Sequence, residues 1–461
     1  MKLYNPLRFF YFHLLLLQLE EYNLTRYLIA IKNTKGIPPV HPFRKPLKLT
    51  AKIWLIIVLT CLLIGLTVLV IKITNFVLFA LFIILSLYFS YLFLIIISIF
   101  LLPIDLSIKG LLVFLAQNKI RRHKNLKIIG IAGSYGKTGM KDIVATILAE
   151  KYQVLKTPES VNTPLGIASL IIKKLTAEVE ILIVEMGEYY QGDIIRLCQI
   201  TPPDIAVITG INEAHLERLK TIETTVKTIF EIASSLKKDG LLLFNGRDKL
   251  IKTYYKQYVG KQKHYFYQMR QSFVFNENLP GYVYQNIPLP ILGRYNLDKI
   301  DGAIYLAKTF HLSEEDINRG LRKITIPPHR LQPIINHAKN ILVIDDSYNG
   351  NPDGVEEAIN TLALFKNRRK IYITPGLVEM GNKSIPIHQR IGKTLNDVVD
   401  LVVLIKNSVT PFVAEGLKQS GFDTRNLLWF SSMFEAQKAL NDIIKPNDVI
   451  LFQNDWPDNY V

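Results

Sequence analysis

Cysteine is almost absent from this sequence: Cys61 and Cys198 are the only two among 461 residues. Two cysteines exclude both a disulfide scaffold and a zinc site built from cysteine ligands, and they fit a reducing compartment. The length is enough for two or three domains, each with its own core.

Acidic residues are also few, with 39 aspartates and glutamates against 55 lysines and arginines, a formal charge of +16. Such a balance is typical of chains that bind nucleic acid or an anionic membrane surface. Much of the excess lies in residues 26–52 and 109–127, which flank hydrophobic segments. The position of the charge favours the membrane, and no nucleic-acid partner is expected.

Charge is missing from residues 53–71 and, after a lone Lys72, from residues 73–104. Each run is long enough to cross a bilayer as a helix, and the short turn between them predicts a transmembrane helical hairpin. Basic residues before and after the hairpin predict that both termini are cytoplasmic. The alternative is a pair of buried core helices.

A phosphate-binding loop is predicted where the apolar run Leu126–Ala132, read as a strand, meets the amphipathic stretch Met140–Tyr152, read as a helix. The connection is Gly133-Ser134-Tyr135-Gly136-Lys137-Thr138. Its glycines let backbone N–H groups approach a polyphosphate at the helix N-terminus. Lys137 would reach the terminal phosphates and the Thr138 hydroxyl a Mg²⁺. The strict Walker spacing would place a glycine at Ile131, and the alternative is a glycine-rich turn that binds nothing.

The rest of the chain alternates between strand-like and helix-like patterns, which predicts mostly parallel sheets covered by helices. Residues 263–292 are interpreted as a small antiparallel excursion, and a domain boundary is expected near Ile326-Pro327-Pro328. The expected strands are Ile181–Val184, Ile205–Ile208, Leu241–Phe244, Ile341–Ile344, Lys370–Ile373, Leu401–Leu404, Leu427–Phe430 and Val449–Phe452; helices are expected at about 296–310 and 313–322.

The predicted fold class is therefore α/β, with a P-loop-type central domain and a Rossmann-like C-terminal domain after the hairpin. The predicted divisions are an amphipathic and basic juxtamembrane segment at 1–50, two transmembrane helices at 51–104, a basic linker at 105–125, a central ATP-binding domain at 126–333 and a C-terminal domain at 334–461.

Polar residues follow three of the expected strands. Glu185 ends one strand and is placed to meet the Mg²⁺ of a nucleotide, because ligands bind at the carboxyl ends of strands in open α/β sheets. His215 comes just after a second strand, among polar groups. After a third, the stretch 345–352 suits ribose, base or polar-substrate contacts, or simply caps the helix that begins near Asp353.

Six motifs in order resemble those of the Mur ligase family. They are Gly133-Ser-Tyr-Gly-Lys-Thr138, Glu185-Met-Gly187, Asn212-Glu-Ala-His-Leu-Glu217, Gly293-Arg-Tyr-Asn296, His329-Arg-Leu-Gln332 and Asp345-Asp-Ser-Tyr-Asn-Gly-Asn-Pro352. The resemblance covers roughly residues 126–461, and the last motif looks most like the branch that joins D-alanyl-D-alanine to a UDP-N-acetylmuramoyl tripeptide.

The resemblance implies an ATP-dependent ligase of peptidoglycan precursor synthesis, with ATP and Mg²⁺ as cofactors and an acyl-phosphate intermediate. Its partners would be a muramoyl-peptide substrate, an amino-acid or dipeptide amine, and the membrane. The implied catalytic residues are Lys137, Glu185 and His215. The implied metal ligands are Thr138 and Glu185 for one Mg²⁺ and His215 for a second.

The same resemblance implies two binding sets. The ATP-binding set is Gly133, Ser134, Tyr135, Gly136, Lys137, Thr138, Gly139, Asn296, Arg330 and Asp345. The substrate-binding set is Asp346, Tyr348, Asn349 and Asn351. Because Arg330 lies at the hinge and the later residues come from the C-terminal domain, site assembly is expected to require domain closure.

The sequence departs from the family pattern at several positions. Ile229 stands where the family usually has a carbamylated lysine two residues before a glutamate, here Glu231, and Lys227 is not an obvious replacement. Lys299 stands where an asparagine usually meets the adenine, Tyr295 where a histidine is usual, and Arg247 where an acidic residue is usual.

The family's N-terminal UDP-sugar-binding domain is also absent, and the hairpin stands in its place. The hairpin suggests a cell-membrane protein whose muramoyl substrate is lipid-linked rather than soluble. The alternative function is a non-catalytic membrane-anchored ATP-binding scaffold, which the isoleucine at position 229 favours and the intact Lys137, Thr138, Glu185 and His215 oppose.

Overall fold

The computed structural model divides into two compact units, Met1–Leu111 and Leu112–Val461, which are described separately. Its described residues are 5–20, 22–38, 46–72, 75–158, 161–212, 219–269, 273–348, 350–377, 380 and 383–454.

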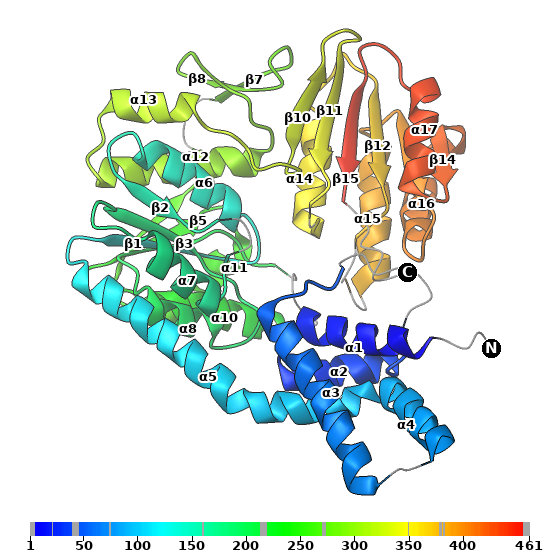
Figure 1. Cartoon of the computed structure of the whole chain (residues 1–461). Helices are drawn as coiled ribbons and strands as arrows, with labels where there is room; N and C mark the ends of the chain where they lie inside the picture. Colours follow the sequence, from blue (N-terminus) through cyan, green and yellow to red (C-terminus); the bar gives the residue numbers. More distant parts are fainter. Residues whose placement is uncertain are drawn as a thin grey trace. The chain divides into compact units, whose positions relative to one another are not determined.

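The N-terminal unit is helical (Figure 1). Its first two helices begin with asparagine caps, Asn5 and Asn23, whose side chains accept backbone N–H groups of the first turn. A small apolar core around Leu17, Tyr27 and Leu94 joins them to the later helices. The helices are α1 (Pro6–Leu19), α2 (Leu24–Thr34), α3 (Ala51–Ile71), α4 (Phe76–Tyr88) and α5 (Ser90–Arg122), the last of which continues into the second unit.

The second hydrophobic run is not the single helix that its lack of charge predicted. The structure divides it at Phe89 into the short apolar helix α4 and the long helix α5. The helices long and apolar enough to cross a membrane are α3 and α5, so the second candidate span is Ser90–Arg122 rather than 73–104. Hydropathy alone could not locate the break, because both sides of it are equally apolar.

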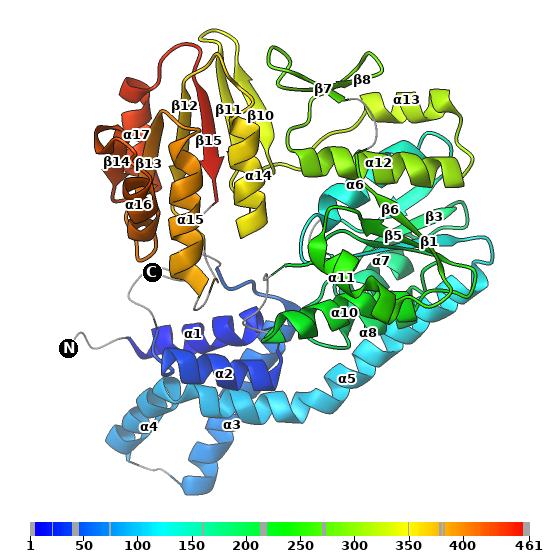
Figure 2. The ribbon, with the colours of Figure 1, turned by 180° about the vertical axis from the view of Figure 1, so that it is seen from behind.

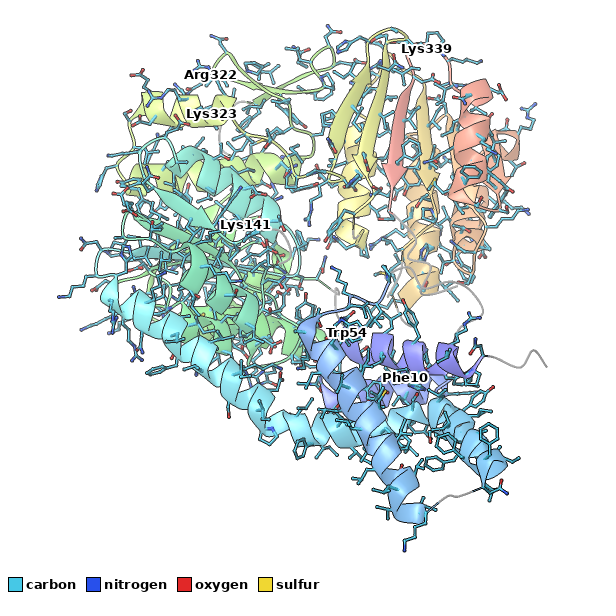
Figure 3. The ribbon with its side chains drawn as sticks, viewed as in Figure 1. Phe10, Trp54, Lys141, Arg322, Lys323 and Lys339 are labelled. Atoms are coloured by element: carbon cyan, nitrogen blue, oxygen red, sulfur yellow. The ribbon has the colours of Figure 1, made fainter. Side chains whose placement is uncertain are left out.

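The apolar side chains of α3 and α5 are mostly not covered by protein. Only 17% and 11% of the residues in their most apolar windows are buried, and Trp54 on α3 is exposed (Figure 3). Lys52, near the start of α3, and Lys109, in the middle of α5, both pair with Asp105 of α5, at 2.6 and 2.5 Å. Outward-facing apolar helices are expected in a lipid environment, where a carboxylate such as Asp105 requires a paired cation.

The second unit contains two α/β domains, of which the central one is built on a parallel sheet with the strand order β2-β3-β1-β4-β5-β6. The middle strand β1 is almost wholly buried, as expected for a continuous apolar run. The strands are β1 (Lys127–Ala132), β2 (Val154–Lys156), β3 (Ile181–Glu185), β4 (Ile205–Ile208), β5 (Leu241–Asn245) and β6 (Lys263–Tyr267).

Helices cover both faces of the central sheet (Figure 2). The end of α5 packs with one group, α7 (Pro164–Lys174), α8 (Asp193–Ile200), α10 (Ile222–Ser234) and α11 (Lys249–Tyr258). The other face carries α6 (Lys137–Leu148), α12 (Arg294–Thr309) and α13 (Glu314–Arg322). The two faces form separate apolar cores, and α6 brings the glycine loop to the edge of the sheet.

The predicted antiparallel excursion is right for only part of residues 263–292. Three short strands form an antiparallel sheet in the order β7-β8-β9, at Phe273–Asn276, Gly281–Tyr284 and Ile287–Leu289. Residues 263–267, however, are β6, the parallel edge strand of the central sheet. The alternation of tyrosines and phenylalanines continues through both, so sequence periodicity could not separate them.

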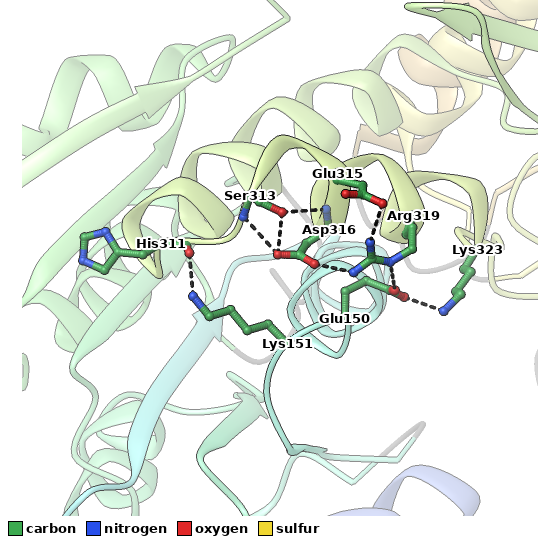
Figure 4. A network of polar contacts seen from close by, with 8 residues as sticks. All are labelled: Glu150, Lys151, His311, Ser313, Glu315, Asp316, Arg319 and Lys323. Carbon is green, nitrogen blue, oxygen red and sulfur yellow. Dashed lines mark hydrogen bonds and ion pairs between the residues drawn. The ribbon is translucent and has the colours of Figure 1, made fainter.

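A polar network fastens α13 to the end of α6 (Figure 4). Ser313 and Asp316 form a reciprocal capping box at the N-terminus of α13. Glu150, whose side chain is 7% exposed, receives Arg319 Nε at 3.3 Å and Lys323 Nζ at 2.7 Å. This arrangement fixes α13 against the helix that follows the glycine loop.

The C-terminal domain has its own sheet, in the order β10-β11-β15-β12-β13-β14, in which only β10 is antiparallel to its neighbour among the described strands. Its strands are β10 (Gln332–Asn336), β11 (Ile341–Asp346), β12 (Lys370–Thr374), β13 (Leu401–Ile405), β14 (Leu427–Phe430) and β15 (Val449–Gln453); its helices are α14 (Pro352–Leu362), α15 (Ser384–Asn396), α16 (Thr410–Gln419), the short η2 (Thr424–Asn426) and α17 (Met433–Ile443).

Candidate active site

The glycine loop lies at the carboxyl end of β1, between that strand and α6. Gly133 has φ 141° and Gly136 has φ 80°, both in the region that favours glycine. A Cβ at Gly133 would lie 2.4 Å from the Thr209 hydroxyl and 2.9 Å from the Gly210 carbonyl oxygen. The Ser134 N–H donates to that carbonyl at 2.8 Å, so the loop is held against the end of β4.

Lys137 begins α6 and folds back over the loop. Its ammonium donates to the Gly133 carbonyl oxygen and lies 3.0 Å from both carboxylate oxygens of Glu188. The buried Ser134 hydroxyl has no hydrogen-bond partner among the described residues. Because a buried hydroxyl is normally paired, the loop fits a phosphate that accepts from Ser134 and Lys137.

The side chain of Tyr135 is engaged by other parts of the protein and is not available to a ligand in the loop. Its hydroxyl donates to Asp248 Oδ2 at 3.2 Å, and its ring packs against Gly210, where a Cβ would clash at 2.2 Å. Asp248 also accepts the Ile211 N–H at 2.7 Å and caps α11. Tyr135 is therefore an anchor for the loop, and only its backbone can face a ligand there.

Glu185 lies at the end of β3, opposite Ile131 of the neighbouring β1, where the strand pattern placed it. Its carboxylate is 3.2 Å from the Nζ of Lys141, a residue of α6 that is 1% exposed. Thr138, in the first turn of α6, is also buried. Thr138 and Glu185 supply oxygen donors of the kind that Mg²⁺ prefers. His215, predicted to hold a second Mg²⁺, lies outside the described residues.

The position of the missing carbamylated lysine is part of the core. Ile229 on α10 is fully buried among apolar side chains, whereas Lys227 is exposed. Glu231 accepts the Gly192 N–H at 2.8 Å and the Ile195 N–H at 3.4 Å, at the N-terminus of α8. In this chain Glu231 is a helix-capping residue, and Lys227 does not replace the lysine.

The loop 345–352 reaches the central domain through Asn351. The Asn351 side chain caps α14 by accepting the Gly354 N–H at 3.0 Å, so the predicted capping role is confirmed. Its Oδ1 also accepts from Asn212 Nδ2 at 3.1 Å, and Asn212 donates to Asp353 at 3.2 Å. Asn351 thus caps α14 and also joins the C-terminal domain to the central domain.

The two aspartates that end β11 have different surroundings. Asp345 lies 2.7 Å from His329 Nδ1 and accepts from the Ser347 hydroxyl. Asp346 accepts the Leu331 N–H at 3.1 Å and a bond from Gln453, and burial raises its pKa to about 7. Asp345 is thus the carboxylate more available to a ligand.

The other predicted residues of the C-terminal domain lie close to these aspartates. Arg330 stacks over the ring of the half-exposed Tyr348, 4.8 Å from its centroid. Asn349 lies outside the described residues.

Asn296 belongs to α12 and is buried. It donates to the Leu292 carbonyl oxygen at 2.7 Å and accepts from Lys299 at 2.9 Å. Asn296 therefore positions Lys299, the residue that stands where the family usually has an asparagine.

Sequence reasoning missed two charged residues near the loop, Lys141 and Glu188, and named Lys299 without giving it a role. Lys141 could have been found, since it lies four residues after Lys137 and hence on the same side of α6. Glu188 follows the Glu185-Met-Gly187 motif directly, but only the fold brings it to Lys137. In combination, the residues can bind a polyphosphate, neutralise its charge and hold a divalent cation.

Replacing Glu188 with glutamine should change how stability depends on pH. Burial raises the pKa of Glu188 from 4.5 to about 7, although Lys137 acts in the opposite direction. The folded state therefore binds the proton more tightly than the unfolded state, and this contribution to stability, present below pH 4.5, is lost as pH rises through 7.

The loss is about 3 kcal/mol between pH 4.5 and 7. Thermal unfolding of the wild type and Glu188→Gln, in detergent at pH 5 and pH 8, measures it. The wild type should lose more stability than the variant on raising the pH. Equal losses in both would show that Glu188 does not carry the effect.

Comparisons with known proteins agree with this arrangement. Residues 131–307 match the Mur ligase middle domain, and residues 329–453 match the Mur ligase glutamate ligase domain. The UDP-N-acetylmuramoyl-tripeptide–D-alanyl-D-alanine ligase of Bacillus subtilis is 29% identical over 336 residues, which are 71% of this chain and 72% of that protein. The protein of the same name in Buchnera aphidicola (Acyrthosiphon pisum) is 29% identical over 60% of this chain, which spans only 63% of that relative's length.

Among solved structures, MurF ligase from Thermotoga maritima in complex with ADP superimposes with a TM-score of 0.65. The alignment covers 75% of this chain and 80% of that chain at 24% identity, which is a likeness of fold.

Proposed function

Since this chain belongs to the Mur ligase family, we propose that its glycine loop and the acidic residues around it serve ATP-dependent formation of an amide bond on a peptidoglycan precursor. The enzyme is a ligase that forms a C–N bond and releases ADP and phosphate. The scaffold alternative is not favoured, because the matched relatives are named as ligases.

One observation carries the proposal: a glycine loop whose buried Ser134 hydroxyl has no partner in the described part of the chain lies beside an ammonium, Lys137, and a strand-end carboxylate, Glu185. A structural turn would satisfy its own buried polar atoms. This loop leaves the Ser134 hydroxyl open as a donor to a phosphate oxygen.

The proposed reaction has two steps. The carboxylate of a muramoyl peptide attacks the γ-phosphorus of ATP, the bond to the bridging oxygen breaks, and an acyl phosphate and ADP form. The amine then attacks the acyl carbon, phosphate leaves, and the amine loses a proton. Such chemistry depends mainly on positioning and charge neutralisation, which Lys137 and the loop N–H groups supply.

The residues around the loop divide the remaining work. Thr138 and Glu185 would hold a Mg²⁺, which supplies positive charge to the phosphate oxygens. Arg330 and Asp345 would contact the nucleotide from the C-terminal domain. Asp346, Tyr348 and Asn351 would contact the substrate that is to be ligated. The contacts of Asn212 with Asn351 and Asp353 support this role, because they hold the C-terminal loop at the end of β4.

The apolar helices α3 and α5 support a finer proposal, that the ligase is anchored in the cell membrane by two spans with its α/β domains in the cytoplasm. Both helices have the length and hydropathy for a span, and basic residues lie at their ends. A membrane anchor favours a lipid-linked muramoyl peptide as the carboxylate donor, because such a donor would be held in the same bilayer.

Phosphate release from ATP by the detergent-solubilised full chain tests both proposals. D-alanyl-D-alanine would be supplied with a muramoyl tripeptide in either its soluble UDP-linked form or its lipid-linked form. We expect turnover only when both substrates are present, and a higher kcat/KM for the lipid-linked donor.

The outcomes distinguish the ligase activity from the choice of carboxylate donor. Equal rates, or a preference for the soluble donor, would contradict the lipid-linked substrate and leave the ligase intact. ATP binding without phosphate release, under every combination of substrates, would overturn the ligase and favour the scaffold.

A further inference from the structure

Lys299 is a buried lysine on α12 that no step above uses. It is 7% exposed, and its ammonium donates to Asn296 Oδ1 at 2.9 Å and lies 4.4 Å from the centroid of the Tyr295 ring. No carboxylate among the described residues forms an ion pair with it. A buried charge without a counter-charge is costly, so something else must compensate the ammonium when it is protonated.

The ammonium lies directly against the glycine loop and the first turn of α6. A Cβ at Gly139 would be 2.9 Å from Lys299 Nζ, and a Cβ at Gly136 would be 3.8 Å from it. Glycine at these positions therefore leaves room for the lysine beside the positive end of the helix. The N-terminus of α6 gives no favourable field to a cation, which makes the position unfavourable until an anion is present.

The charged groups around Lys299 strengthen this argument. Burial and, to a smaller extent, the nearby Arg330 guanidinium lower the pKa of Lys299 to about 7, while Asp298 acts to raise it. The carboxylate of Asp298 is already engaged by Arg247 Nε at 2.6 Å and by the Met269 N–H at 2.7 Å. Lys299 therefore has a neighbouring cation, Arg330, and no ion-pair partner of its own among the described residues.

We propose that Lys299 is a phosphate-binding residue of the nucleotide site, contacting the polyphosphate of ATP in addition to Lys137. The inference rests on the proposed ATP-dependent function and extends it. Asn296 acts as a positioning residue, because it is anchored to the Leu292 carbonyl oxygen and holds the ammonium at the loop. An asparagine at position 299 could contact a base but would carry no charge, so the lysine changes which part of the nucleotide is recognised.

Calorimetric titration of the full chain in detergent with adenosine, AMP, ADP and ATP tests the proposal. Lys299→Met removes the charge and keeps the length of the side chain. We expect it to weaken ADP and ATP binding about 10- to 100-fold, the effect of one lost charge-assisted hydrogen bond, and to leave adenosine binding unchanged. Lys299→Arg should retain most of the affinity.

Lys308→Met is the matched control, since Lys308 lies on the same helix but is exposed and paired with Glu314 at 2.7 Å. It should bind every ligand as the wild type does. If Lys299→Met does not fold, Lys299→Gln, which is neutral and can still donate to Asn296, is measured instead.

Two results would overturn the assignment of Lys299. Unchanged ADP affinity would show that the ammonium does not meet the phosphates, and an equal loss for adenosine and ADP would place Lys299 at the base. A wild-type chain that binds none of the four ligands would instead overturn the proposed ATP-dependent function and the inference with it.

Discussion

Replacing Lys137 with alanine is expected to lower ATP-dependent ligation by about 10²–10³-fold, the usual effect of removing one preorganised donor to a developing charge. Lys137 is placed for this role, because its ammonium lies over the loop within 3.0 Å of Glu188. Glu188 pairs with the Lys137 ammonium, which would contact the phosphates of ATP when the nucleotide binds. The rate of phosphate release at saturating substrates measures the effect.

The control is Lys127→Ala, at the opposite end of β1. Its side chain is 59% exposed and 3.9 Å from Asp204, and its removal should leave the rate within about twofold, as for other weak surface pairs. A Lys137→Ala variant that keeps the wild-type melting temperature and loses less than tenfold in rate would contradict the role of Lys137. Loss of melting cooperativity would instead point to a structural role.

The second large effect concerns the stability of the central domain. Lys141 and Glu185 are 1% and 5% exposed and lie 3.2 Å apart, so they form a buried ion pair (Lys141 is labelled in Figure 3). Removing one member of such a pair leaves the other charge buried without a partner. Lys141→Met should therefore lower the free energy of unfolding by about 3–5 kcal/mol.

A double-mutant cycle tests the pairing. Lys141→Met combined with Glu185→Gln should be more stable than Lys141→Met alone, because no unpaired charge stays buried. Denaturant unfolding in detergent supplies the free energies. The control is Lys156→Met. Lys156, in β2, pairs at 2.6 Å with Asp142, which lies on α6 as Lys141 does, but the Lys156 side chain is 44% exposed. Its loss should change stability by less than about 1 kcal/mol.

If Lys141→Met cost no more than Lys156→Met, the buried pair would not be a stabilising feature. If the double variant were less stable than both single variants, Lys141 and Glu185 would act independently of each other.

Much of the fold was predictable because its signals are local. The run Leu126–Ala132 and the glycines after it predicted β1 and the loop, and the run Ile205–Ile208 matches β4 to the residue. Long apolar runs between turn residues make such strands recognisable. The pattern was misleading where it was uniform: at Phe89 inside the second hydrophobic run, and at residues 263–267, which join the parallel sheet.

The candidate site was predictable to a lesser degree. The loop, Lys137, Glu185 and the stretch 345–352 stand at strand ends, where the motif order indicates chemistry. No local pattern showed that Lys137 meets Glu188, or that Lys141 pairs with Glu185. The first two partners are 51 residues apart in the chain and the second two are 44 apart, and only strand pairing between β1 and β3 brings them together.

The sequence by itself determined the α/β architecture, the glycine loop, the apolar helices and the family to which the chain belongs. These features depend on composition and on spacing over a few residues. Only the tertiary structure decided which charges neutralise one another, which buried groups lack a partner, and that Lys299 lies at the loop. Burial and electrostatic pairing depend on distances in space, and residues far apart in the chain set those distances.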